Sequence, residues 1–141
     1  MNPRSLLMTG WFVQLILPSQ AAAPSPCDAK AALGKVQMQY GMAESMLAPP
    51  FELIKIVDIA ETSLGAPPES ANQYATSTTY VVQSRYCQGE ATLSNGTKEQ
   101  VFWRIDQAKD GNSEYERIDH CSARHDTFGD NCTNIRAPVS N

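Results

Sequence analysis

The side chains best suited to chemistry are concentrated near the C-terminal end of the sequence. They are, in order, Asp119, His120, Cys121, His125, Asp126, Asp130 and Cys132. Imidazole, carboxylate and thiolate groups bind Zn²⁺, so a metal site would centre on His120, His125 and Asp126. The spacing matches no established ligand pattern, however, and oxidised cysteines cannot bind a metal. We therefore expect a disulfide loop with surface histidines here, and neither a metal nor another cofactor.

Catalytic nucleophiles are not indicated by the sequence. A pair of Cys121 with His120 or His125 would need a free thiolate in an electropositive setting, whereas the chain is acidic. A Gly-x-Ser-x-Gly motif is absent, and the 15 acidic residues single out no pair of carboxylates. We expect no catalytic residue. A small envelope enzyme or metal-dependent hydrolase centred on His120 and His125 stays open as the alternative.

The N-terminus has the pattern of a cleavable signal peptide. Arg4 precedes an apolar run from Leu6 to Leu17, and Ala21-Ala22-Ala23 offers the small side chains that signal peptidase accepts. The run is about a dozen residues, whereas a membrane helix needs roughly 20. We expect cleavage after Ala23, a periplasmic or secreted protein, and no membrane span after signal cleavage.

Residues 24–133 are expected to form a single domain, followed by a flexible tail over residues 134–141. Removing Arg4 with the signal peptide leaves 10 basic and 15 acidic residues, a formal charge of about −5. This balance argues against nucleic acid and anionic membranes as partners, because both bind to clusters of Lys and Arg.

The mature chain predicts one helix over residues 25–47. Ser25 is a good N-cap, Pro26 suits the first helical position, and Asp28 lies three residues after Ser25 as in a capping box. An apolar stripe follows at steps of three and four: Ala29, Leu33, Val36, Tyr40, Ala43 and Leu47. Gly34 and Gly41 share a face beside it, where either a backbone approaches closely or glycine is merely tolerated.

Four strands are predicted after the helix: Phe51–Ala60, Thr79–Leu93, Glu99–Asp106 and Ser113–Cys121. A long polar stretch from Thr62 to Ser77 separates the first two. Ser94-Asn95-Gly96 predicts a three-residue hairpin loop, because Gly96 can supply the left-handed conformation. Cys87 then faces Trp103, whereas a two-residue loop would set Trp103 against Gln88. Asn95 and Asn131 also begin glycan acceptor patterns, and we interpret both as turn residues.

Four cysteines in an exported chain predict two disulfides. A Cys87–Cys121 bond is disfavoured, because a strand would separate the two by about 9–10 Å and a disulfide needs Cα atoms within about 7 Å. Cys27 can reach Cys87 if the helix crosses the sheet. We therefore favour Cys27–Cys87 with Cys121–Cys132; Cys27–Cys121 with Cys87–Cys132 remains open.

The expected fold is α+β, with one N-terminal helix packed on a four-stranded antiparallel sheet. Over residues 25–121 this order resembles the cystatin-like shape, and small bacterial periplasmic proteins of unknown function built that way. Protease-inhibiting cystatins carry a Gln-x-Val-x-Gly hairpin, from which Gln83-Ser84-Arg85-Tyr86-Cys87 departs, so the resemblance does not imply protease inhibition.

Aromatic strand residues give the one positive indication of function. Phe102 and Trp103 point to opposite faces of their strand, so one of them can remain exposed on the uncovered face of the sheet, near Tyr86. The sequence thus favours a non-catalytic binding or accessory module. It would contact an unknown protein or small ligand through the exposed sheet face or the loop from Thr62 to Ser77.

Overall fold

A computed structural model describes residues 23–127 and 129–138 of the 141-residue chain. The expected signal peptide lies outside these residues, except for Ala23. The elements run in the order α1 (Lys30–Glu44), β1 (Leu53–Gly65), the 3₁₀ helix η1 (Glu69–Asn72), β2 (Thr79–Leu93), β3 (Lys98–Asp110), β4 (Ser113–Ser122) and the 3₁₀ helix η2 (Ala123–His125). The predicted α+β class is confirmed.

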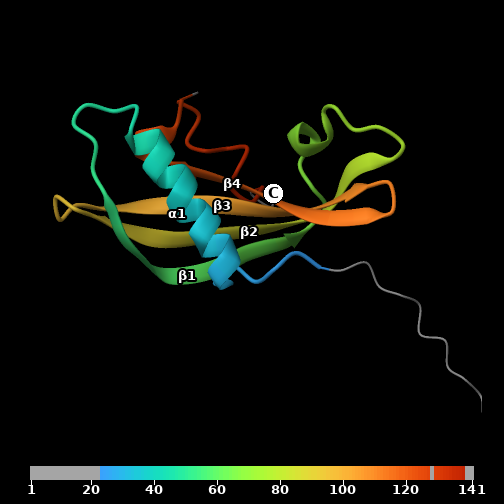
Figure 1. Cartoon of the computed structure of the whole chain (residues 1–141), viewed down its shortest axis with the longest axis horizontal. Coiled ribbons are helices and arrows are strands. Elements are labelled where there is room, and N and C mark those ends of the chain that lie inside the picture. Colours follow the sequence, from blue (N-terminus) through green and yellow to red (C-terminus); the bar gives the residue numbers. More distant parts are fainter. Residues whose placement is uncertain (1–22, 128, 139–141) are drawn as a thin grey trace, which may run out of the picture.

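The four strands form one antiparallel sheet in chain order, β1-β2-β3-β4. In Figure 1, α1 crosses this long, curved sheet at an angle. Cys87 pairs with Trp103 and Gly89 with Val101, as the three-residue loop requires. Gly96 has a positive φ of 84°, and the Leu93 N–H donates to the carbonyl of Thr97 across the loop. The predicted register is confirmed.

Both disulfides are those favoured from the sequence. Cys27 bonds to Cys87, and Cys121 bonds to Cys132, each with Cα atoms 5.7 Å apart. The first joins the segment before α1 to the middle of β2. The second closes a short loop that brings the C-terminal segment back onto the sheet.

The predicted start of the helix is wrong. Helix α1 begins at Lys30, and no described side chain caps it. Ser25 instead donates from its backbone N–H and its hydroxyl to Glu116 Oε1 on β4, at 2.5 and 2.6 Å. The chain before the helix is therefore held to the sheet by a tertiary contact and by the Cys27 disulfide, so the capping box with Asp28 does not form.

The first strand and the loop after it also differ from expectation. Strand β1 continues to Gly65 rather than ending at Ala60, so the connection to β2 is shorter and contains η1. Strand β3 likewise extends to Asp110. The packed chain reaches Arg136, beyond the domain end expected at residue 133, because Ile135 packs on Phe102 and the Arg136 guanidinium lies 4.6 Å from the Phe102 ring centroid.

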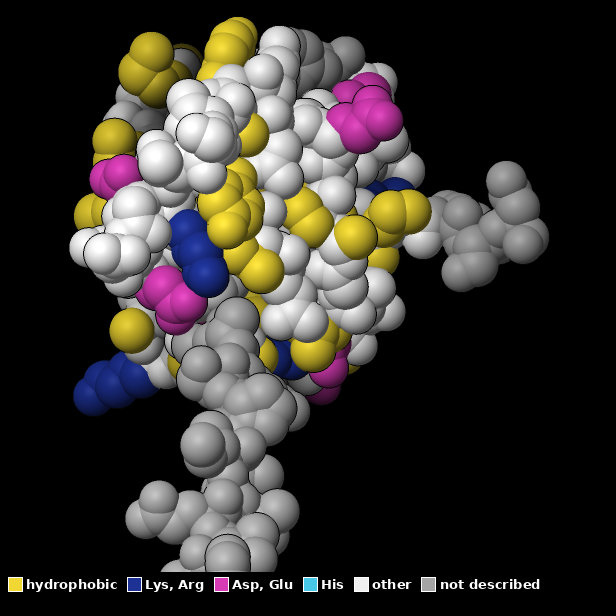
Figure 2. Space-filling view, turned by 90° about the vertical axis from the view of Figure 1, so that its right-hand side faces the viewer, with side chains coloured by type: hydrophobic (Ala, Val, Ile, Leu, Met, Phe, Trp, Pro, Cys, Tyr) yellow, Lys and Arg dark blue, Asp and Glu magenta, His cyan; other side chains and the backbone are white. Residues whose placement is uncertain are grey.

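The sheet face opposite α1 is covered where Tyr86 and Phe102 lie, and Trp103 lies under α1, which corrects the expected exposed aromatics. Tyr86 is 2 % exposed, Phe102 8 % and Trp103 0 %. The C-terminal segment, with Cys132 and Ile135, covers Phe102. At the other end of the sheet the loop that contains η1 packs on β2 and β4; Figure 2 views the molecule from this end. The alternation of residues along a strand cannot reveal that the C-terminal segment and the η1 loop cover the sheet, because both segments are irregular.

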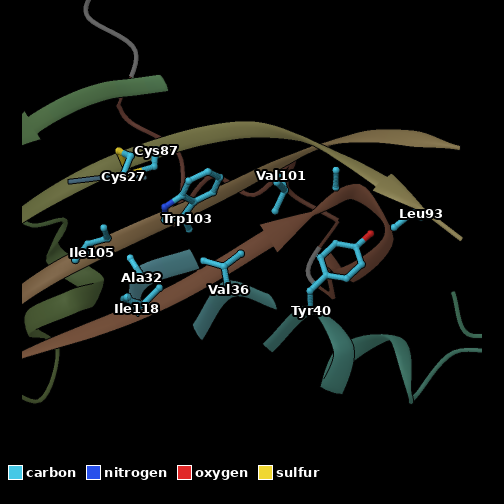
Figure 3. Packing of buried hydrophobic residues seen from close by; sticks show 11 residues of the cluster. Cys27, Ala32, Val36, Tyr40, Cys87, Leu93, Val101, Trp103, Ile105 and Ile118 are labelled. Atoms are coloured by element: carbon cyan, nitrogen blue, oxygen red, sulfur yellow. A yellow bond between two sulfur atoms is a disulfide. The ribbon is translucent and has the colours of Figure 1, made fainter. Parts of the chain in front are cut away.

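The core lies between α1 and the face of the sheet that α1 covers. Val36 and Tyr40 of the predicted stripe are fully buried, and Ala32 and Glu44 complete the buried side of the helix. Figure 3 shows Ala32 and Val36 directed toward Trp103, Ile105 and Ile118, with the Cys27–Cys87 bond at the edge of the cluster. Gly34 and Gly41 have open space where a Cβ would lie, so no backbone approaches them closely.

Strand β1 passes unusually close to β2 at Gly89. A Cβ on Gly89 would lie 2.8 Å from Ile56 Cγ2, 3.2 Å from the Val57 carbonyl oxygen and 3.3 Å from the Trp103 ring. Just beyond, the register of β1 shifts between Val57 and Ala60, where Asp58 has a positive φ of 54°. Gly89 therefore allows a bulged strand to lie against the core tryptophan.

Gly89→Ala should lower the free energy of unfolding by about 1–3 kcal/mol, because the added methyl overlaps backbone and core atoms. Gly34→Ala is the matched control and should raise it by about 0.5–1 kcal/mol, because the site is open and alanine favours the helix. Urea unfolding of both variants measures the difference. Equal effects of the two substitutions would contradict the close approach at Gly89.

Candidate functional site

The two histidines on which the alternative metal or catalytic reading centres lie side by side in a continuous hydrogen-bond chain. His120 Nε2 is 3.0 Å from His125 Nδ1, and His125 Nε2 is 2.5 Å from Glu44 Oε2 at the end of α1. On the other side, His120 Nδ1 is 3.3 Å from Gln39 Oε1, and Gln39 Nε2 donates to the Ile118 carbonyl at 2.5 Å. The chain joins α1, β4 and η2.

Glu44 is the acidic end of this chain and is 2 % exposed. Arg124 donates to both of its carboxylate oxygens, at 2.8 and 3.2 Å, and the Phe51 N–H donates to Oε1 at 2.9 Å. Burial alone would raise the pKa of Glu44, but the hydrogen bonds from Arg124, His125 and Phe51 outweigh it and hold the pKa at about 2. Glu44 is therefore an ionised group with its partners in place.

The direction of the Gln39 hydrogen bonds places the proton of His120. Because the Gln39 amide nitrogen donates to a carbonyl, the amide oxygen faces His120 and accepts from its Nδ1–H. In neutral His120 the other ring nitrogen, Nε2, is then the acceptor in the contact with His125. Burial, and then the neighbouring His125, lowers the pKa of His120 to about 4, which agrees with this assignment.

This arrangement stabilises the fold rather than exposing a reactive group. The side chain of His125 is 3 % exposed, so the expectation of surface histidines is wrong for His125. Its ring also packs edge-on against Tyr40, with ring centroids 4.3 Å apart. A pocket of about 260 Å³ adjoins both histidines and is lined by the Cys121–Cys132 loop, but both cysteines are oxidised.

The alternative metal site at His120, His125 and Asp126 finds no support in the geometry. Among the described residues, no group of three or more His, Cys, Asp or Glu side chains is arranged to hold an ion. The Asp126 carboxylate instead accepts from the backbone N–H groups of Asn131 and Cys132, at 2.8 and 3.4 Å. Asn131 and Cys132 both have a φ of 60°, so Asp126 organises a tight turn.

A second pocket, of about 270 Å³, lies between the η1 loop and the end of the sheet. Buried Val81 and Ala108 line it together with three tyrosines that remain exposed: Tyr74 at 88 %, Tyr80 at 38 % and Tyr115 at 43 %. Arg117 lines it as well. Figure 2 faces this end of the molecule and shows hydrophobic side chains exposed among largely uncharged groups. We call this site the tyrosine pocket.

The loop that forms the tyrosine pocket is held in place by specific hydrogen bonds. The Asn72 side chain accepts from the Val81 N–H at 2.7 Å and donates to the Val81 carbonyl at 3.1 Å, so it replaces the strand partner that β1 no longer supplies there. Arg117 donates to the Ala71 carbonyl at 3.3 Å. The Gly111 N–H donates to the Thr78 carbonyl. The pocket is therefore pre-formed.

A third feature, missed in the sequence, is a row of methionines on the outer side of α1 and in the turn that follows it. Met38, Met42 and Met46 recur every four residues and are 59, 65 and 85 % exposed. Methionine is usually buried, so three exposed methionines in one row need an explanation. The spacing itself was the available signal, because residues four apart share a helix face.

Comparisons with protein-family models, with curated proteins and with solved structures gave no match. The resemblance to cystatin-like periplasmic proteins therefore stays a prediction. Within the described residues, no helix has the length and apolar character required to cross a bilayer.

The free energy of unfolding should fall as the pH is lowered from 7 to 4. Unfolded histidine takes up a proton near pH 6.5, whereas folded His120 stays neutral down to about pH 4. Lowering the pH therefore stabilises the unfolded state relative to the folded state. The loss should be on the order of 1–2 kcal/mol, since one pKa unit corresponds to about 1.4 kcal/mol and solvent reduces the effect. Urea unfolding at several pH values measures it.

His120→Gln is the control, because a glutamine oxygen can still accept from His125 but does not titrate. The loss between pH 7 and 4.5 should shrink in this variant. A later loss, from about pH 4.5 toward 2 as Glu44 takes up a proton, should remain in both proteins. An unchanged loss between pH 7 and 4.5 would contradict the assignment to His120.

Proposed function

We propose that this chain is an exported, non-catalytic binding module that holds one side chain of a protein partner in the tyrosine pocket. The observation that carries the proposal is the pocket itself: three exposed tyrosines and Arg117 around a buried floor, on a loop fixed by hydrogen bonds. Tyrosine and arginine dominate the energetic centres of protein interfaces. A fixed loop lowers the entropy that binding costs.

The size of the tyrosine pocket favours a protein over a free small molecule. Small-molecule sites usually enclose about 300–1,000 Å³, and this pocket has about 270 Å³. Such a volume suits one large side chain inserted from a partner surface. The exposed Tyr74, at 88 %, would then contact the partner around the inserted group.

The location outside the cytoplasm rests on the two disulfides and the signal-peptide pattern. Disulfides persist in oxidising compartments such as the periplasm or the extracellular space, and all four cysteines are paired. The envelope-hydrolase alternative has less support, because Glu44 and His125 are buried and occupied by structural hydrogen bonds.

A photo-crosslinking amino acid placed at Tyr74 should trap a defined partner in intact cells that export the protein. The yield of that crosslinked product should fall at least several-fold when Tyr115→Ala is added, because the pocket loses one wall. The same crosslinker at Lys98, at the opposite end of β3, is the control and should trap little. Gel analysis with mass spectrometry identifies and measures the products.

Equal products from Tyr74 and Lys98, or a yield that Tyr115→Ala leaves unchanged, would contradict the tyrosine pocket as the binding site. Exposed Tyr115 contributes little to folding, so its replacement should keep the thermal unfolding temperature within a few degrees. This check separates loss of binding from loss of structure.

A further inference from the structure

The methionine row is chemically distinct from the rest of the surface. The chain contains five methionines: Met1 and Met8 lie in the expected signal peptide, and the other three are Met38, Met42 and Met46. Among the described residues, the methionines are Met38 and Met42 on α1 and Met46 in the turn that follows it, and each is more than half exposed. A core role does not account for them, because α1 packs through Ala32, Val36 and Tyr40 on its other side.

The spacing makes Met42 a sequence neighbour, four residues away, of both other methionines. Side chains four residues apart on a helix have Cβ atoms about 5–6 Å apart, and methionine has three rotatable side-chain bonds beyond its backbone. Past Glu44 the chain makes one further turn, in which the Ser45 N–H donates to the Gly41 carbonyl and the Met46 N–H to the Ala43 carbonyl, and this turn carries Met46.

Thioether sulfur is a soft ligand, and among biological metal ions it selects Cu(I) over hard cations such as Mg²⁺ and Ca²⁺. It carries no acidic proton, so binding does not require deprotonation. In an oxidising compartment thiols are lost to disulfides, as all four cysteines of this chain are. Thioethers remain the soft ligands available under those conditions.

From these observations we propose that Met38, Met42 and Met46 form a surface site for a soft monovalent cation, physiologically Cu(I), with Ag(I) as its redox-stable equivalent. Helix α1 and the turn after it supply the spacing, and the Cys27–Cys87 bond fixes the segment just before that helix to β2. The site lies on the C-terminal half of α1 and that turn, while the tyrosine pocket lies between η1 and β4. It does not depend on the proposed partner binding.

Ag(I) added to the disulfide-bonded protein in chloride-free buffer should bind with one-to-one stoichiometry. Native mass spectrometry measures the stoichiometry. NMR of methyl-labelled methionine should show the three methyl signals shifting together and reaching a plateau at one equivalent. Cu(I), supplied with a colorimetric chelator as competitor, should bind to the same site, whereas Mg²⁺ and Ca²⁺ should leave the methyl signals in place.

Met42→Leu should weaken Ag(I) binding at least ten-fold, because Met42 is the sequence neighbour, four residues away, of both other methionines. The triple variant M38L/M42L/M46L should lose the site. Leucine keeps the apolar surface and the helix, so these variants should unfold like the parent protein. Two controls should bind Ag(I) normally: Tyr74→Ala, which alters the other pocket, and His120→Gln, which removes one of the two imidazoles of the histidine chain.

Equal Ag(I) affinity of the triple leucine variant and the parent would overturn the proposal, as would methyl signals that do not move at one equivalent. Leucine has no thioether but keeps the surface apolar, so it would preserve a site that docks an apolar partner. The triple variant therefore also distinguishes a metal site from a hydrophobic contact. Failure of this test leaves the crosslinking result at Tyr74 unaffected, because the two sites share no residue.

Discussion

The structure depends on one helix being fixed to the sheet at both of its ends. Before the first turn, the Cys27–Cys87 bond ties the chain covalently to β2. At the last turn, buried Glu44 is paired with Arg124 and His125 from the segment after β4. Between these points the contact layer is thin, with Ala32, Val36 and Tyr40 as the fully buried apolar residues. These few apolar contacts hold the helix on the sheet because both of its ends are restrained.

The second restraint has a different physical character from the first. A buried ion pair gains little over apolar packing, but losing one partner leaves an uncompensated charge in the core. Glu44 therefore makes the position of η2 specific, since only Arg124 and His125 complete its hydrogen bonds. The histidine chain continues this contact to Ile118 on β4. The histidines thus connect three elements.

Much of the fold could be predicted from local pattern. The Asn95-Gly96 turn set the register of β2 and β3, and strand spacing then excluded one disulfide pairing. What local pattern could not reveal were partners distant in sequence. Ser25 is a good cap for a helix, yet Glu116 on β4 captures its N–H and hydroxyl. Glu44 is not part of the apolar stripe that the sequence shows, and its Arg124 partner lies 80 positions away.

The candidate site was predicted less well, for the same reason. His120 and His125 are expected at the surface, but they contact each other, and His125 is buried against a carboxylate from α1. Phe102 and Tyr86 were expected near an open face, because strand alternation gives the face of a residue but not what lies above it. The loop from Thr62 to Ser77 was expected to matter for binding. Its inner part does form a pocket, although β1 takes its first residues.

The irregular course of β1 has a consequence for the behaviour of the protein at high concentration. This strand lies at the edge of the sheet, pairs only with β2, and carries three register shifts along its length. A straight edge would offer a regular ladder of backbone donors and acceptors to any other extended chain. The bulge at Asp58 and the side chain of Lys55 interrupt that ladder. The outer edge of β1 is thereby a poor template for growth of the sheet into neighbouring molecules.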